Sequence, residues 1–131
     1  MRPLATLLIL LIALPVAAQD LLTPEEFDRY TRGKTLFYGQ GGEIYGAEIY
    51  YENRRVTWSF LDGECKEGRW YAKGPLICFT YEDNPAPQCW SFLRRPTGLI
   101  ARFENDPATT DLYEARDTGE ALICPGPKVG V

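Results

Sequence analysis

The chain has 131 residues, of which 45% are hydrophobic, and it carries 14 basic and 18 acidic side chains but no histidine. This length fits one domain. The basic residues are scattered along a chain of net charge −4, which argues against a nucleic-acid partner. The lack of histidine excludes serine–histidine and cysteine–histidine catalysis in its usual form within one chain.

Residues 1–18 have the pattern of a secretory signal peptide. Arg2 gives a short basic start, residues 4–16 form an uncharged apolar run, and Val16-Ala17-Ala18 supplies small residues for the peptidase. The run is shorter than the roughly 20 residues that a membrane-spanning helix needs. We therefore expect cleavage after Ala18, a single domain over residues 19–131, no remaining membrane span, and a periplasmic or secreted location.

A short helix is predicted at the start of this domain. Thr23 can cap it, Pro24 suits its first turn, and Glu26 completes a capping box. Phe27 and Tyr30 lie three residues apart and share one face, which we expect to pack on the rest of the domain. Such a short helix is marginally stable without that packing.

After Gly33 the hydrophobic pattern changes to a period of two, which indicates strands. The clearest alternation is Val56, Trp58 and Phe60, and we expect these three side chains to point inward. The predicted strands are 34–38, 47–52, 56–60, 64–71, 76–81, 88–94, 99–104 and 111–115, with a further edge at 121–124. Residues Gly39–Gly46 are interpreted as a flexible turn region at a hairpin tip.

The four cysteines predict two disulfides, because an exported chain meets an oxidising compartment. Three connectivities are possible. A hairpin turn centred near Asp83-Asn84 pairs Tyr81 with Ala86 and Cys78 with Cys89, which favours Cys78–Cys89 and leaves Cys65–Cys124. The cysteine spacing contains no C-x-x-C pair, so we expect neither a structural zinc nor any other cofactor.

About eight short strands joined by short turns predict a mostly β fold. Sequential hairpins favour an antiparallel up-and-down barrel, with the N-terminal helix across one end; an open sheet or a two-sheet sandwich is the alternative. An eight-stranded barrel has an interior that side chains fill or that holds one small ligand.

Several short motifs in this predicted series of hairpins match the sequence pattern of a known family. They are Gly33-Lys34-Thr35-Leu36, Gly68-Arg69-Trp70, Cys78 and Cys89-Trp90. With them, the chain resembles a family of small exported bacterial lipocalin-like (calycin-like) domains of unknown function. The resemblance implies the lipocalin-like fold more than a function, since the lipocalin Gly-x-Trp signature on the first strand is absent here.

We expect no enzymatic activity from the side chains that this sequence contains. Ser59 and Ser91 lie mid-strand, outside any nucleophile elbow. Paired carboxylates are the remaining catalytic option. That option requires the barrel to bring together members of one acidic set, namely Glu43, Glu48, Glu52, Glu64 and Glu67.

Two functions remain open at this stage. The first is a binding module whose barrel interior holds a small apolar or amphipathic ligand. Its candidate ligand-lining residues are Trp58, Trp70, Trp90, Phe79 and Tyr81. The alternative is a disulfide-braced interaction or inhibitor domain that presents the loops 39–46 and 83–87 to a periplasmic protein. A hollow interior favours the first, and a filled interior favours the second.

Overall fold

A computed structural model describes residues 21–116, Leu122 and Cys124. The expected signal peptide, residues 1–18, lies outside the described residues, as do Ala121 and Ile123 of the expected edge strand; Leu122 and Cys124 are not in a strand. The elements in chain order are α1 (Pro24–Thr31), β1 (Thr35–Gln40), β2 (Glu43–Tyr50), the 3₁₀ turn η2 (Glu52–Arg54), β3 (Arg55–Ser59), β4 (Lys66–Lys73), β5 (Leu76–Tyr81), β6 (Asn84–Arg95), β7 (Gly98–Phe103) and β8 (Leu112–Ala115).

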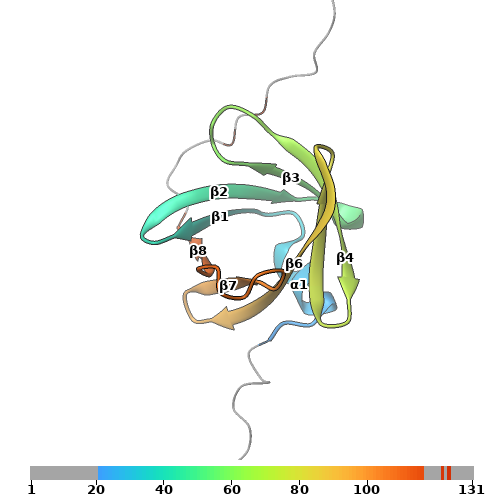
Figure 1. Cartoon of the computed structure of the whole chain (residues 1–131), viewed down its shortest axis with the longest axis vertical. Helices are drawn as coiled ribbons and strands as arrows, with labels where there is room; N and C mark the ends of the chain where they lie inside the picture. The colour runs from blue at the N-terminus through green and yellow to red at the C-terminus, as the bar shows by residue number, and fades with distance from the viewer. Residues whose placement is uncertain (1–20, 117–121, 123, 125–131) are drawn as a thin grey trace, which may run out of the picture.

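The strands form a closed antiparallel barrel in the order β1-β2-β3-β4-β5-β6-β7-β8, as the sequence predicts. Every strand pairs with its neighbour in sequence, and β8 returns to pair with β1, so that the sheet curves round a complete ring (Figure 1). Closure places the inward-facing side chains of all eight strands around one interior, and it pairs strand edges that an open sheet would leave exposed.

Helix α1 begins at the predicted capping box. The Thr23 hydroxyl accepts a hydrogen bond from the Glu26 backbone N–H at 3.2 Å, and the Glu26 carboxylate accepts one from the Thr23 N–H at 3.4 Å. The helix is anchored to β6, because the Leu22 N–H donates to the Phe92 carbonyl at 2.8 Å. These contacts hold the helix across one end of the barrel, where its apolar face meets the interior.

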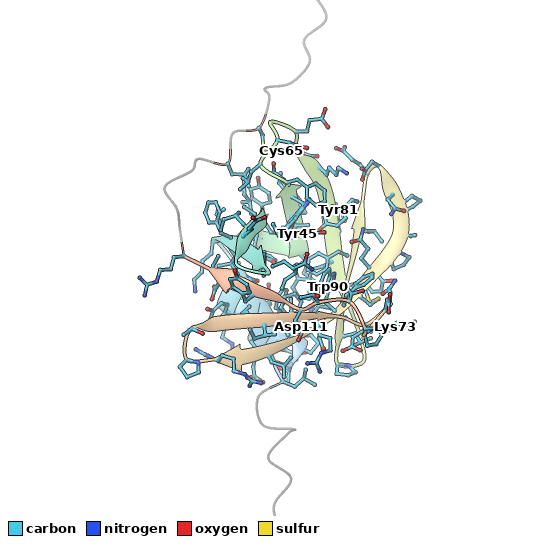
Figure 2. All side chains as sticks on the ribbon, turned by 60° about the vertical axis from the view of Figure 1, so that its left-hand side comes forward. Tyr45, Cys65, Lys73, Tyr81, Trp90 and Asp111 are labelled. Atoms are coloured by element: carbon cyan, nitrogen blue, oxygen red, sulfur yellow. A yellow bond between two sulfur atoms is a disulfide. The ribbon has the colours of Figure 1, made fainter. Side chains whose placement is uncertain are left out.

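Phe27 closes this end of the barrel. Its side chain is fully buried, and its ring centroid lies 4.4 Å from that of Phe92, 5.2 Å from Trp70 and 5.7 Å from Tyr50. The predicted inward face of α1 is thus confirmed. We call this the closed end, and the opposite end, where β3 ends and β4 begins, the mouth. In Figure 2, Tyr45, Cys65 and Tyr81 lie toward the mouth and Lys73 toward the closed end.

Two predicted loops turn out to be mostly strand. The region 39–46 is a tight hairpin that turns only at Gly41 and Gly42, both of which have positive φ (59° and 88°). Gly39 and Gly46 lie within strands, where aromatic rings cover their backbone. The expected hairpin register also shifts, since Tyr81 pairs with Asn84 rather than with Ala86. β6 therefore begins before its two prolines, in a stretch whose register with β5 is irregular.

Both predicted disulfides are present. Cys78 and Cys89 lie opposite each other on β5 and β6, with their Cα atoms 4.0 Å apart, so this bridge joins neighbouring strands. Cys65 and Cys124 have a Cα–Cα distance of 5.4 Å and connect the loop before β4 to the C-terminal segment. The first bridge closes a short loop and the second a long one.

Removing either bridge should destabilise the fold, and the effect should be larger for the bridge that closes the longer loop. Replacing Cys78 and Cys89 with alanine is expected to lower the free energy of unfolding by about 3 kcal/mol. Replacing Cys65 and Cys124 should lower it by about 4 kcal/mol, because a bridge that closes a longer loop removes more conformational freedom from the unfolded chain. Urea unfolding of both double variants measures this difference. A larger loss from the short bridge would show that local packing, and not chain entropy, dominates.

Candidate ligand-binding cavity

The barrel interior contains a cavity of about 160 Å³. It begins above the closed-end residues Tyr50, Phe79 and Phe92, which are buried, and reaches the mouth at Tyr45 and Phe60, whose exposed fractions are 39% and 45%. The exposure therefore rises from the closed end to the mouth. Because Phe27 covers the other end, the interior is closed there and opens at the mouth.

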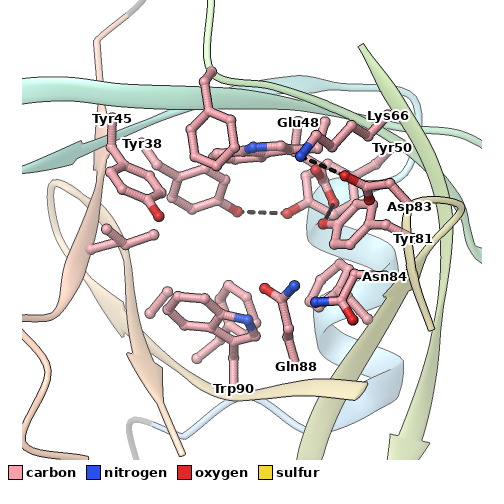
Figure 3. Close-up of a pocket in the computed structure, with 16 residues that line it drawn as sticks. Tyr38, Tyr45, Glu48, Tyr50, Lys66, Tyr81, Asp83, Asn84, Gln88 and Trp90 are labelled. Atoms are coloured by element: carbon pink, nitrogen blue, oxygen red, sulfur yellow. Dashed lines mark hydrogen bonds and ion pairs between the residues drawn. The ribbon is translucent and has the colours of Figure 1, made fainter. Parts of the chain in front are cut away.

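One side of the cavity is polar. Tyr38 of β1, Glu48 and Tyr50 of β2, and Tyr81 of β5 form this side, which we call the polar wall. The hydroxyl oxygens of Tyr38 and Tyr50 lie 2.7 Å apart in a hydrogen bond, and the Tyr81 hydroxyl donates to Glu48 Oε1 at 2.9 Å. Figure 3 shows this wall facing Trp90 across open space.

The opposite side of the cavity is mainly apolar, although the Gln88 amide also lies there beside Trp90 (Figure 3). It is formed by Trp90 and Phe92 of β6, Ala101 of β7 and Leu112 of β8. Phe92, Ala101 and Leu112 are buried, and Trp90 packs against Phe103 with a centroid distance of 4.9 Å. A ligand in the cavity would thus contact mainly hydrocarbon and one amide on one side, and hydroxyl and carboxyl groups on the other.

Glu48 is the buried carboxyl of the polar wall. Only 2% of the residue is exposed, and within the described part of the chain its Oε2 atom has no hydrogen-bond partner. Burial raises the pKa of this carboxyl to about 8, against a smaller opposing effect of the Tyr81 hydrogen bond. Burial also raises the pKa of Tyr38, Tyr50 and Tyr81, so these hydroxyls remain protonated near neutral pH.

The mouth is lined by aromatic rings and one ion pair. The Trp58 ring lies 5.7 Å from Tyr45 and 5.3 Å from Phe60, centroid to centroid. Gly46 permits this arrangement, since a Cβ atom there would collide with the Trp58 ring. Beside these rings, Lys66 Nζ and Asp83 Oδ2 are 2.7 Å apart, and this bridge joins the start of β4 to the turn between β5 and β6.

The structure places four of the five sequence-predicted lining residues at the cavity, namely Trp58, Phe79, Tyr81 and Trp90. Trp70 lies elsewhere. Its ring is inward, as predicted, but it packs against Phe27 at the closed end and is covered by the Arg54 guanidinium at 4.5 Å. Trp70 therefore belongs to the core at the closed end rather than to the cavity surface.

Sequence reasoning missed Glu48 and Tyr50 of the polar wall, because it did not assign which face of β2 points inward. Ala47, Ile49 and Tyr51 share one face of this stretch, and Glu48 and Tyr50 on the other face line the cavity. The pairing of β2 with β3 shows which face of β2 points inward. Glu48 lies opposite Trp58, and residues paired directly across antiparallel strands share a face. An inward Trp58 therefore implies an inward Glu48.

The carboxylate pairs considered from the sequence do not form inside the barrel. Glu43, Glu52, Glu64 and Glu67 are exposed, and Glu48 is the member of that set that lies in the cavity. Among the described residues, no group of three or more His, Cys, Asp or Glu side chains could hold a metal ion. The same part of the chain contains no helix of the length and apolarity needed to cross a bilayer.

The fold and the cavity define a small up-and-down β-barrel. Its interior is closed at the end that Phe27 covers, and it is lined by both polar and apolar side chains. Comparisons with protein-family models, with curated proteins and with solved structures found no match for this chain.

Proposed function

We propose that this protein is a small exported binding module that holds one small amphipathic ligand inside its barrel. The observation that carries the proposal is the cavity of about 160 Å³ between an apolar and a polar wall. Binding sites for small molecules are concave, mainly apolar and equipped with a few oriented polar groups. This cavity has each of those properties.

The cavity volume supports a ligand of about one ring. Sites for drug-sized molecules usually enclose about 300–1,000 Å³, whereas an engineered apolar cavity of about 150 Å³ in another protein accommodates benzene. A volume of about 160 Å³ is close to the second value. Fatty acids and larger cofactors exceed this space, so the proposed ligand has one ring or an equivalent short chain.

An interaction or inhibitor domain is the less favoured alternative. That function needs no cavity, and the loops chosen to carry it are largely strand: Gly39–Gly46 forms a tight hairpin, and residues 84–87 open β6. The hollow interior and the short loops both support a ligand-binding barrel over a surface-binding scaffold.

Export forms part of the same proposal. The predicted signal peptide over residues 1–18 and the two disulfides both suit a periplasmic or secreted protein. The proposal contains no catalytic step, because binding alone accounts for the features of the cavity.

Filling the cavity should abolish binding. Ala101→Phe adds a ring to the apolar wall, whereas Ile100→Phe places the same ring on the opposite face of the same strand, outside the cavity. Native mass spectrometry of the protein purified from a periplasm is expected to show extra mass that is lost on denaturation. We expect Ala101→Phe to lack this mass and Ile100→Phe to retain it. A bare wild-type mass that also fails to gain small aromatic probes would contradict the proposal.

A further inference from the structure

We propose that the ligand is a small organic cation, a protonated primary amine attached to one apolar ring, whose ammonium group binds Glu48. This inference rests on the proposed binding function and names the chemical class of the ligand. Three independent features of the cavity lead to it: an unpartnered carboxyl oxygen, the balance of charge around it, and the aromatic rings at the mouth.

The first feature is the incomplete hydrogen bonding of Glu48. Tyr81 satisfies Oε1, while Oε2 has no partner among the described residues, although the side chain is almost fully buried. Leaving a buried polar atom unpaired costs stability, so such atoms in a native structure call for an explanation. Glu48 lines the cavity, so a donor group on a ligand that reaches this carboxyl would supply the missing hydrogen bond.

The second feature is the charge that faces this carboxyl. Tyr38 of β1, Tyr50 of β2 and Tyr81 of β5 are neutral near pH 7, because burial raises the pKa of each. Lys66 of β4 is paired with Asp83 of the β5–β6 turn, so these two charges offset each other. Glu48 is therefore the ionisable group of the cavity that can balance a ligand charge, and the balance favours a cation over an anion.

The third feature is the aromatic lining between the mouth and Glu48. Trp58 lies directly opposite Glu48 on the neighbouring strand, and its ring is 6.3 Å from Tyr38 and 5.7 Å from Tyr45. Aromatic faces attract ammonium groups, and the attraction is stronger where water is excluded. The same rings supply apolar contact for the ring of the ligand, while Trp90 and Leu112 cover its other side.

Binding of an amine should release a proton from the protein at neutral pH. Glu48 is mostly protonated below its raised pKa of about 8, whereas an ammonium ion requires the carboxylate. An alkyl ammonium keeps its own proton to about pH 10, as lysine does. The affinity should therefore rise about tenfold per pH unit below pH 8 and then level off.

The test uses three probes of matched shape: 2-phenylethylamine, the neutral 2-phenylethanol and the anionic phenylacetate. Isothermal titration calorimetry of the oxidised protein is run from pH 6 to pH 9, in two buffers of different ionisation enthalpy. We expect the amine to bind more tightly than the alcohol at pH 8, phenylacetate not to bind, and the amine to release up to one proton at pH 7.

Variants assign the effect to the carboxyl. Glu48→Gln is expected to weaken amine binding about thirtyfold or more, because it removes one partner of a buried charge pair. Tyr81→Phe removes the hydrogen bond that lowers the pKa of Glu48, so the pH at which amine binding levels off should move upward. Glu43→Gln, on the same strand but exposed, is the control and should match the wild type.

The outcomes separate the two proposals. If the alcohol binds as well as the amine, with no pH dependence, the cation inference is wrong and the binding function stands. Tight binding of phenylacetate also overturns the inference. If none of the three probes binds and no ligand co-purifies, both proposals are wrong.

Discussion

Replacing Glu48 with glutamine is expected to stabilise the empty barrel by an amount that grows from pH 5 to pH 8. The carboxyl has a pKa of about 8 in the folded protein, against an ordinary value of 4.5. The folded state therefore binds a proton throughout this range, while the unfolded chain has released it. Glutamine resembles the protonated acid in shape but does not titrate, so the variant avoids the free-energy cost of protonating the buried carboxyl on folding.

The direction of this effect follows from proton linkage. Because the folded state of the wild type holds more protons than the unfolded state, its free energy of unfolding falls as the pH rises. The fall begins near pH 4.5 and ends above about pH 8, and the shift in pKa corresponds to a total loss of about 4 to 5 kcal/mol. At pH 4 the contribution of this group disappears.

Urea unfolding monitored by tryptophan fluorescence at pH 5, 6, 7 and 8 checks this expectation. The quantity of interest is the difference in unfolding free energy between Glu48→Gln and wild type at each pH. Glu43→Gln is the matched control, since that carboxylate lies on the same strand and is exposed. A difference that stays constant from pH 5 to pH 8 would show that Glu48 has an ordinary pKa.

Replacing Phe27 with alanine is expected to destabilise the fold by about 3 to 5 kcal/mol, the range for removing a buried aromatic side chain. Phe27 is fully buried and contacts the rings of Tyr50, Trp70, Phe79 and Phe92. Three of these rings also form the inner end of the cavity, so the truncation removes the layer behind them. The variant should therefore bind larger ligands as well as unfold more easily.

The midpoint of urea unfolding measures the stability change, and Arg29→Ala is the control on an exposed position of the same helix. That control should change the unfolding free energy by about 0.5 kcal/mol or less. A similar small effect of Phe27→Ala would mean that α1 contributes little to the core. Phe27→Leu is expected to fall between the two, because it keeps part of the apolar volume.

Much of the fold was predictable because each element carries a local signal. The capping box marked the start of α1, and the alternation of Val56 with Trp58 gave the inward face of β3. The cysteine register was also correct, because Cys78 and Cys89 lie close to the turn. The strand boundaries near Gly39–Gly46 were wrong, since glycines that indicate turns also occur where a ring packs directly on the backbone.

The candidate site was harder to predict than the fold. Aromatic side chains identify a barrel interior from sequence alone, which is why Trp58, Phe79, Tyr81 and Trp90 were found. Glu48 was not chosen as a lining residue, because a strand that is apolar on both faces leaves its orientation undecided by pattern. The sequence pattern alone did not assign the side chain of Glu48 to the interior or to solvent. Cross-strand pairing with Trp58 decides its position, and that pairing is a tertiary property.

The order of strands around the ring has a consequence for folding kinetics. Each neighbouring pair except β1 with β8 joins strands that are consecutive in the chain, so most pairings need only a short loop to close. The pairing of Phe37 with Ala115 spans nearly the whole domain, and β8 is the shortest strand. The entropy of loop closure therefore makes this junction the last to form on the folding pathway. Substitutions in β8 should then mainly change the rate of unfolding, whereas substitutions in the early hairpins should mainly change the rate of folding.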